Sequence, residues 1–204
     1  MRQFFERFED INPRIVYLLM ALALVLPVIK PIGMPIVVDR NMTQPVFDWI
    51  ENCEPGEIVF FDAAYGGGSD AELSPQLEAW FYHCLKKDLK VIGIAQWNTG
   101  AMIAGDLCKK VAEQAKADGY NAEYGVDWVF VGWKSMIWRE LREDFWKTCG
   151  NTDFWGNHFD TLPLMEKVRK WNVETSRSFI VFVAGSPGVG TYLVNWADHD
   201  IYVG

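Results

Sequence analysis

The sequence predicts an α/β protein, a three-layer sandwich with a mainly parallel, Rossmann/flavodoxin-like sheet that is preceded by one transmembrane helix. Three observations support this prediction. Short apolar runs alternate with amphipathic segments from residue 57 onward. The runs are apolar at consecutive rather than alternate positions, which is typical of parallel strands buried on both faces. An uncharged stretch of fifteen residues, Ile15 to Ile29, stands before them.

This apolar stretch favours a membrane anchor over two alternatives. Fifteen helical residues rise about 22 Å, so crossing a hydrocarbon core of about 30 Å also requires residues out to Ile36, with Lys30 reaching the interface. A cleaved signal peptide would need a small-x-small motif after the stretch, and the sequence offers none. A buried core helix would show a polar stripe, which this stretch lacks.

The predicted organisation has three parts, a juxtamembrane segment, an anchor and an α/β domain: residues 1–14, 15–38 and 39–204. Basic residues flank the anchor unequally, with Arg2, Arg7 and Arg14 before it and Lys30 and Arg40 after it. Because the more basic flank tends to remain in the cytoplasm, we expect a cytoplasmic N-terminus and an extracytoplasmic α/β domain. The first fourteen residues fit either an interfacial helix or a loose terminus.

Charge and cysteine spacing limit the classes of partner. The chain carries 19 Lys and Arg against 27 Asp and Glu, a formal net charge of −8. Nucleic acids and anionic lipid surfaces need clustered basic residues, so neither is expected as the main partner. Metal-ligand spacings are absent, and we predict no metal and no cofactor. The four cysteines fit either a disulfide or buried thiols, and the helical stripes carrying Cys84 and Cys108 favour thiols.

Five apolar runs predict the strands, at residues 57–61, 90–95, 127–132, 178–185 and 200–204. Between them, apolar residues recur every three or four positions, which is typical of amphipathic helices. We expect Ser74 to cap the first helix, with Pro75 in its first turn. Asn98 or Thr99 is expected to cap the second, which Gly119 ends in a left-handed conformation. Two further helices are expected at residues 135–148 and 164–171.

In parallel α/β sheets, ligands bind beyond the carboxyl ends of the strands, where loops and helix N-termini gather. The residues predicted to bind a ligand there are polar or glycine and follow four strands: Asp62, Gln96, Asn98, Thr99, Lys134, Ser186, Gly188 and Gly190. Aligned helix N-termini would favour a polar or anionic ligand. Ordinary caps and turns use the same residue types, and this alternative stays open.

One motif resembles the phosphate-binding loop GxxxxGK[ST], the run "GSPGVGT" after the fourth predicted strand. Thr191 stands where that loop has its lysine, so the group that reaches the phosphates is missing. A nucleotide hydrolase is therefore not predicted, whereas a backbone nest that turns the chain or holds a small anion is. The sequence also contains no GxSxG or HExxH motif, which leaves catalysis uncertain and disfavours it.

Ten tryptophans are an unusual number for a chain of this length. Three explanations are open: a tryptophan-rich core, a surface for a partner or membrane, and a site where sugars stack on indole rings. The core explanation is favoured, because a mid-sized parallel sheet needs large apolar side chains on both faces.

Three segments carry a resemblance: "YGVDWVFVGWK" at 124–134, "DTLPLMEKV" at 160–168 and "VFVAGSPGVGTYLVNW" at 181–196. Together with the N-terminal apolar helix, they resemble an uncharacterised family of prokaryotic membrane proteins with the pattern G-[VI]-D-[YW]-V-x-x-G-[YW] and a later L-P-L-M element. The resemblance covers most of residues 15–204. It implies a membrane-anchored α/β domain followed by further membrane helices, whereas this chain ends at Gly204. It implies no catalytic residues.

Two functions follow from these predictions. The first is a membrane-anchored binding or accessory module that recognises a small polar or anionic ligand or a partner membrane-protein complex. Its partners would be other membrane-protein subunits or a second copy in a homo-oligomer. The alternative is a membrane-tethered hydrolase or transferase that uses Asp62 and the loop at residues 96–99 at the carboxyl ends of the strands.

Overall fold

The computed structural model describes residues 12–30, 40–134, 146, 149–169, 179–184 and 202–203. The chain forms two compact units, Met1–Arg40 and Asn41–Gly204, and each is described by itself.

The first unit contains helix α2, Pro13–Ile29. Asn12 begins it as the N-cap, and its side chain accepts a hydrogen bond from the backbone N–H of Arg14 at 3.0 Å. None of its residues is buried within the unit. In the part of the chain that the structure describes, no helix combines the length and the apolar character needed to cross a membrane. Residues 1–11 and 31–39, which the predicted juxtamembrane segment and anchor include, lie outside the described residues.

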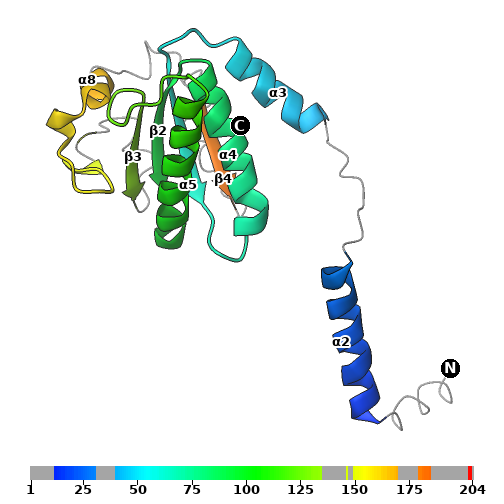
Figure 1. Ribbon diagram of the computed structural model, residues 1–204. Coiled ribbons are helices and arrows are strands. Elements are labelled where there is room, and N and C mark those ends of the chain that lie inside the picture. The colour runs from blue at the N-terminus through cyan, green and yellow to red at the C-terminus, as the bar shows by residue number, and fades with distance from the viewer. Residues whose placement is uncertain are drawn as a thin grey trace. The chain divides into compact units, whose positions relative to one another are not determined.

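The second unit is built on a parallel sheet with the strand order β3-β2-β1-β4-β5 (Figure 1). The strands are β1 Ile58–Ala64, β2 Lys90–Ala95, β3 Trp128–Trp133, β4 Phe179–Ala184 and β5 Tyr202–Val203. Every neighbouring pair in this order is parallel. The prediction of an α/β protein with a parallel sheet is therefore confirmed, and all five predicted strands are present.

The prediction that β1 ends before Asp62 is wrong, because the strand continues to Ala64. Asp62 pairs with Ile94 of β2 and Phe182 of β4, so it lies inside the sheet. A carboxylate can lie inside a buried strand only when hydrogen bonds replace its water, and Gln96 supplies such bonds. The strand was predicted to end at Asp62 because this residue is charged.

Helix α4, Asp70–Lys86, begins five residues before the predicted start at Pro75. Ser74 is therefore not its N-cap. It lies in the second turn, where its hydroxyl donates to the Asp70 carboxylate. Pro75 is tolerated inside the helix although it removes one backbone donor. The apolar face that follows compensates by burial and includes Leu77, Trp80 and Phe81.

Helix α5, Asn98–Ala117, also differs at its beginning. Trp97 occupies the N-cap position in an extended conformation, and no side chain caps the helix there. Asn98 and Thr99 are instead the first two helical residues, and both are exposed. The predicted end is confirmed, because Gly119 has a φ of +90° directly after the Asp118 C-cap.

The other described elements are α3 Arg40–Glu51, the short 3₁₀ helix η1 Phe159–Thr161 and α8 Pro163–Arg169. Helix α8 agrees with the prediction for residues 164–171 to within two residues. Helix α3 was not predicted, because Pro45 in its middle is unfavourable for a helix. The helix predicted at residues 135–148 falls almost wholly outside the described residues.

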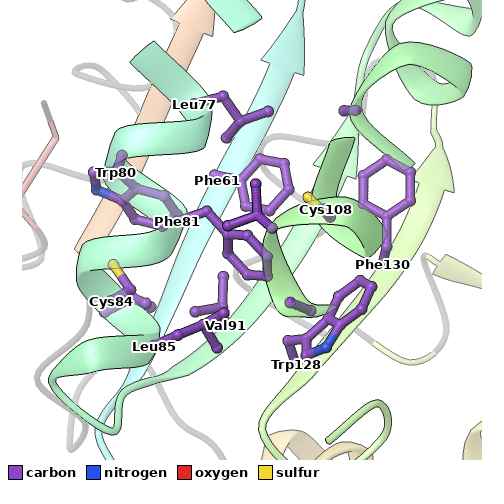
Figure 2. Close-up of a cluster of buried hydrophobic side chains, with 14 of the residues drawn as sticks. Phe61, Leu77, Trp80, Phe81, Cys84, Leu85, Val91, Cys108, Trp128 and Phe130 are labelled. Carbon is purple, nitrogen blue, oxygen red and sulfur yellow. The ribbon is translucent and has the colours of Figure 1, made fainter. Parts of the chain in front are cut away.

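Helices α4 and α5 lie side by side over one face of the sheet (Figure 1). Figure 2 shows this core, in which Phe61 and Phe130 from the strands meet Phe81 and Cys108 from the helices. The Phe61 and Phe130 rings stack with centroids 6.0 Å apart, on either side of Gly93 in β2. A Cβ at Gly93 would overlap Phe61 and lie 2.6 Å from Phe130 Cδ2, so this strand position requires glycine.

The opposite face carries a second buried cluster, which η1 and α8 help to form. Its members include Phe60, Ile92, Val131, Cys149, Phe159 and Met165. Cys84, Cys108 and Cys149 are fully buried thiols without a disulfide, as predicted for the first two. Burial raises the pKa of all three, that of Cys149 to about 12, so these thiols stay protonated.

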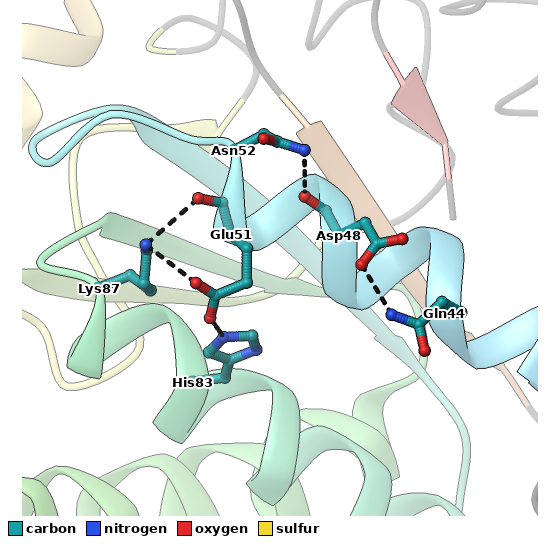
Figure 3. A network of polar contacts seen from close by, with 6 residues as sticks. All are labelled: Gln44, Asp48, Glu51, Asn52, His83 and Lys87. Atoms are coloured by element: carbon teal, nitrogen blue, oxygen red, sulfur yellow. Dashed lines mark hydrogen bonds and ion pairs between the residues drawn. The ribbon is translucent and has the colours of Figure 1, made fainter.

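Helix α3 attaches to α4 through the polar network of Figure 3. The Glu51 carboxylate lies 2.7 Å from His83 Nε2 and 3.2 Å from Lys87 Nζ. Phe47 stacks on the His83 ring at 4.9 Å, and Ile50 enters the core beneath. The hydrogen bonds from His83 and then Lys87 hold the pKa of Glu51 below its ordinary value.

We expect Gly93→Ala to lower the free energy of unfolding by about 1–3 kcal/mol, because the new methyl group must displace two stacked rings. Urea unfolding followed by circular dichroism measures this change. Gly67→Ala is the matched control, since nothing lies within 4 Å of a Cβ there. Equal stability of the two variants would show that the core has room at Gly93.

Since the pKa of Glu51 is lowered, its ionised form strengthens the α3–α4 contact above the ordinary carboxyl pKa, and this contribution disappears as the pH falls through the lowered value. We expect His83→Gln to raise the pKa of Glu51 more than Lys87→Gln does. Carboxyl-detected NMR titration measures both. Lys86→Gln removes the same charge one residue away and should leave Glu51 unchanged; the reverse ranking of His83 and Lys87 would contradict the assignment.

Candidate functional site: the carboxyl edge of the sheet

The candidate site lies where β1, β2 and β3 end, and it is organised around Gln96. Asp62 is fully buried in β1, and Gln96 follows β2 directly. Asp62 Oδ1 accepts a hydrogen bond from the backbone N–H of Gln96 at 3.0 Å, and Oδ2 accepts one from the Gln96 side-chain amide. These two predicted site residues are thus brought together. Asp62 acts within the structure by holding Gln96 in place.

The first turn of α5 rests directly on the end of β1. A Cβ on Gly100 would lie 2.7 Å from the Ala63 carbonyl oxygen and 2.5 Å from that of Tyr65, so only glycine permits this approach. The β1–α4 loop reaches the same turn, because a Cβ on Gly66 would lie 3.0 Å from Thr99 Oγ1. Thr99 therefore lies against the glycine loop while its side chain stays exposed.

The glycine loop itself, residues 66–69, is open on its outer side. Nothing lies within 4 Å of a Cβ on Gly67 or Gly68. The loop closes with a hydrogen bond from the Ser69 N–H to the Gly66 carbonyl at 2.9 Å. Just before the loop, the buried Tyr65 hydroxyl lies 3.0 Å from Ser74 Oγ, which ties the end of β1 to α4. Burial raises the pKa of Tyr65, so its hydroxyl stays protonated.

The end of β3 completes the described part of the site. Trp133 Nε1 donates to the Gln96 carbonyl oxygen at 3.0 Å, and the Lys134 N–H donates to the Ala95 carbonyl at 2.9 Å. Lys134 is half-buried. Of the predicted site residues, Asp62, Gln96, Asn98, Thr99 and Lys134 therefore gather at one edge. Ser186, Gly188 and Gly190 lie outside the described residues, together with the run that resembles a phosphate-binding loop.

Trp97 and Trp133 border this edge and were not among the predicted site residues. Their side chains are 42% and 51% exposed, whereas Trp80 and Trp128 are buried in the core. The tryptophan-rich core is therefore real for some of the indoles, whereas Trp97 and Trp133 are exposed. Trp97 and Trp133 follow or end strands whose carboxyl edge was already the predicted site. That position was the signal that could have identified them.

The amino edge of the sheet carries different chemistry. Lys90 Nζ lies 2.7 Å from Asp127 Oδ1 and 3.0 Å from Asp88 Oδ1, and the first pair is nearly buried. Burial alone would lower the pKa of Lys90, but hydrogen bonds to Asp127 and Asp88 outweigh it and raise the pKa. Among the described residues, no group of His, Cys, Asp and Glu could hold a metal ion.

The fold and this edge together define an α/β protein with a candidate ligand site at the carboxyl ends of a parallel sheet. No protein-family model, curated protein or solved structure matches the chain. The interpretation of the site therefore depends on its geometry.

We expect Asp62→Asn to destabilise the protein by about 1–3 kcal/mol, because one of the two Gln96 donors then faces an amide N–H₂ group instead of an oxygen. Urea unfolding measures the loss. The same measurement on Gln96→Ala and on the double variant completes a thermodynamic cycle. A coupling energy near zero would contradict a stabilising interaction between the Asp62 and Gln96 side chains.

Proposed function

We propose that the chain is a membrane-anchored α/β binding module that recognises a small polar or anionic ligand at the carboxyl edge of its sheet. One observation carries this proposal. The glycine loop after β1, the first turn of α5 and the end of β3 all meet around Gln96. Open parallel sheets bind their ligands at this edge, because loops and helix N-termini from several strands are close together there.

The polar groups of the edge suit recognition of hydrogen-bonding ligands. The first turn of α5 contains no acidic residue, and its exposed Asn98 and Thr99 offer an amide and a hydroxyl beside the N–H groups of the helix N-terminus. The first turn of α4 differs, since it contains Asp70 and Glu72. The positive end of α5 is therefore the favourable one for a polar or partly anionic ligand.

Binding is favoured over catalysis by the position of Asp62. A membrane-tethered hydrolase or transferase would need this carboxylate to reach a substrate, yet it is fully buried and hydrogen-bonded to Gln96. A general base must come within hydrogen-bond reach of the proton that it removes. The buried carboxylate therefore supports a structural role.

The proposal also includes the type of α/β architecture. The strand order β3-β2-β1-β4-β5 supports a Rossmann-type three-layer arrangement over a flavodoxin-type one, whose order differs. We also propose a membrane anchor at residues 15–38, a cytoplasmic N-terminus and a likeness to prokaryotic membrane proteins. The proposed partners are other membrane-protein subunits or a second copy of the chain.

Native mass spectrometry of the detergent-extracted full chain tests the proposed function. We expect a co-purifying small molecule whose occupancy falls about tenfold in Gly66→Ala. The new Cβ would lie 3.0 Å from Thr99 Oγ1, so this hydroxyl must shift, whereas the Trp97 ring at 3.7 Å stays in ordinary contact. Glu113→Ala is the control, because Glu113 is exposed near the C-terminal end of α5, away from this edge. A bare protein, or equal occupancy in both variants, would contradict a binding site at this edge. Turnover of the bound molecule would support the enzyme instead.

A further inference from the structure

Two indole side chains are held at the carboxyl edge with much of their surface open to solvent. Trp97 is the N-cap of α5, so its backbone is fixed by the start of a twenty-residue helix. Its ring carbon Cε3 lies 3.7 Å from the place where a Cβ of Gly66 would stand, so the ring lies beside the glycine loop. The ring is supported on one side and 42% exposed.

Trp133 is held by a different contact. Its Nε1–H donates to the Gln96 carbonyl at 3.0 Å, so the polar atom of the ring is already satisfied by the protein. The side chain is nevertheless 51% exposed, and this exposed surface is therefore mostly apolar carbon. The preceding Gly132, at a φ of +83°, packs beneath Phe154, which fixes the chain at this point. Both indoles are thus oriented before any ligand arrives.

We propose that the ligand of this edge is a neutral carbohydrate, whose ring stacks on Trp97 with Trp133 as a second platform. This inference depends on the proposed function and names its ligand class. A sugar ring has an apolar C–H face and a rim of hydroxyl groups. The apolar face matches an exposed indole, and the hydroxyl rim matches side chains that both donate and accept hydrogen bonds. Exposed Asn98 and Thr99 are such side chains, and they follow Trp97 directly in the chain.

Charge favours a neutral sugar over a nucleotide or another phosphate compound at the same place. The chain has a formal net charge of −8, which repels an approaching anion. The neighbouring first turn of α4 adds Asp70 and Glu72 to that repulsion, and Lys134 at the same edge offsets only one of these two charges. A neutral sugar is repelled neither by the net charge of the chain nor by the acidic first turn of α4. It can still stack on the indole ring and form the hydrogen bonds.

A glycan array of neutral oligosaccharides built from glucose, galactose, mannose and N-acetylglucosamine, probed with the detergent-extracted full chain, tests this inference. For the best-bound glycan, we expect tryptophan fluorescence titration to show about a tenfold weaker affinity for Trp97→Ala, a smaller loss for Trp133→Ala and partial retention for Trp97→Phe. Phe47→Ala is the matched control, since Phe47 is an exposed aromatic residue on α3. Its affinity should equal that of the unchanged protein, and thermal unfolding checks that each variant is folded.

Each other outcome overturns the inference in a distinguishable way. Glycan binding that survives both tryptophan substitutions would place the sugar elsewhere. Binding of inorganic phosphate or ATP without any glycan, when it is lost in Gly66→Ala, would overturn the carbohydrate and keep the proposed function. Absence of glycan, phosphate and ATP binding, together with a bare protein in native mass spectrometry, would overturn both.

Discussion

The structure depends on burying a carboxylate in the central strand. β1 pairs with β2 on one side and β4 on the other, and both of its faces are covered, so Asp62 has no access to water. An unpaired carboxylate in that position would cost several kcal/mol. The backbone and side-chain amides of Gln96 provide the missing hydrogen bonds. In doing so they fix the path of the chain directly after β2, where α5 begins.

The hydrogen bonds between Asp62 and Gln96 also position the other elements of the carboxyl edge. Once Gln96 is fixed, Trp97 must be the N-cap of α5, and the helix can approach β1 closely because Gly100 has no side chain. The Gln96 carbonyl also receives the Trp133 indole N–H, so the ends of β1, β2 and β3 are linked through one residue. The exposed indoles are therefore held by contacts that the sheet itself requires. Such preorganisation lowers the entropy lost when a ligand binds.

The strands could be predicted because two-sided burial produces continuous apolar runs, and all five lie where these runs are. The errors have particular physical causes. Asp62 was taken for a strand end because its hydrogen-bond partner Gln96 lies thirty-four residues away in the chain. Ser74 was taken for a cap because a Ser-Pro pair commonly begins a helix, whereas here the Ser74 hydroxyl lies inside α4, donates to the Asp70 carboxylate and contacts the Tyr65 hydroxyl. The polar site residues could be predicted because they follow the strand ends. Trp97 and Trp133 could not, because they differ from Trp80 and Trp128 in being exposed, and composition contains no information on exposure.

The amino edge of the sheet contributes to stability, whereas the carboxyl edge carries the proposed binding site. At the amino edge, the nearly buried Lys90 and Asp127 neutralise each other, and the Glu123 N–H donates to the second Asp127 oxygen at 2.7 Å. Removing Lys90 would leave the nearly buried Asp127 carboxylate without this counter-ion, which costs far more than the pair contributes, so this edge is suited to holding the fold. At the carboxyl edge the only carboxylate of β1 is enclosed, and amide, hydroxyl and indole groups face the solvent. Removing water from neutral groups of this kind costs much less than removing it from an ion. The edge that can exchange water for a ligand is therefore the one where the predicted site residues meet.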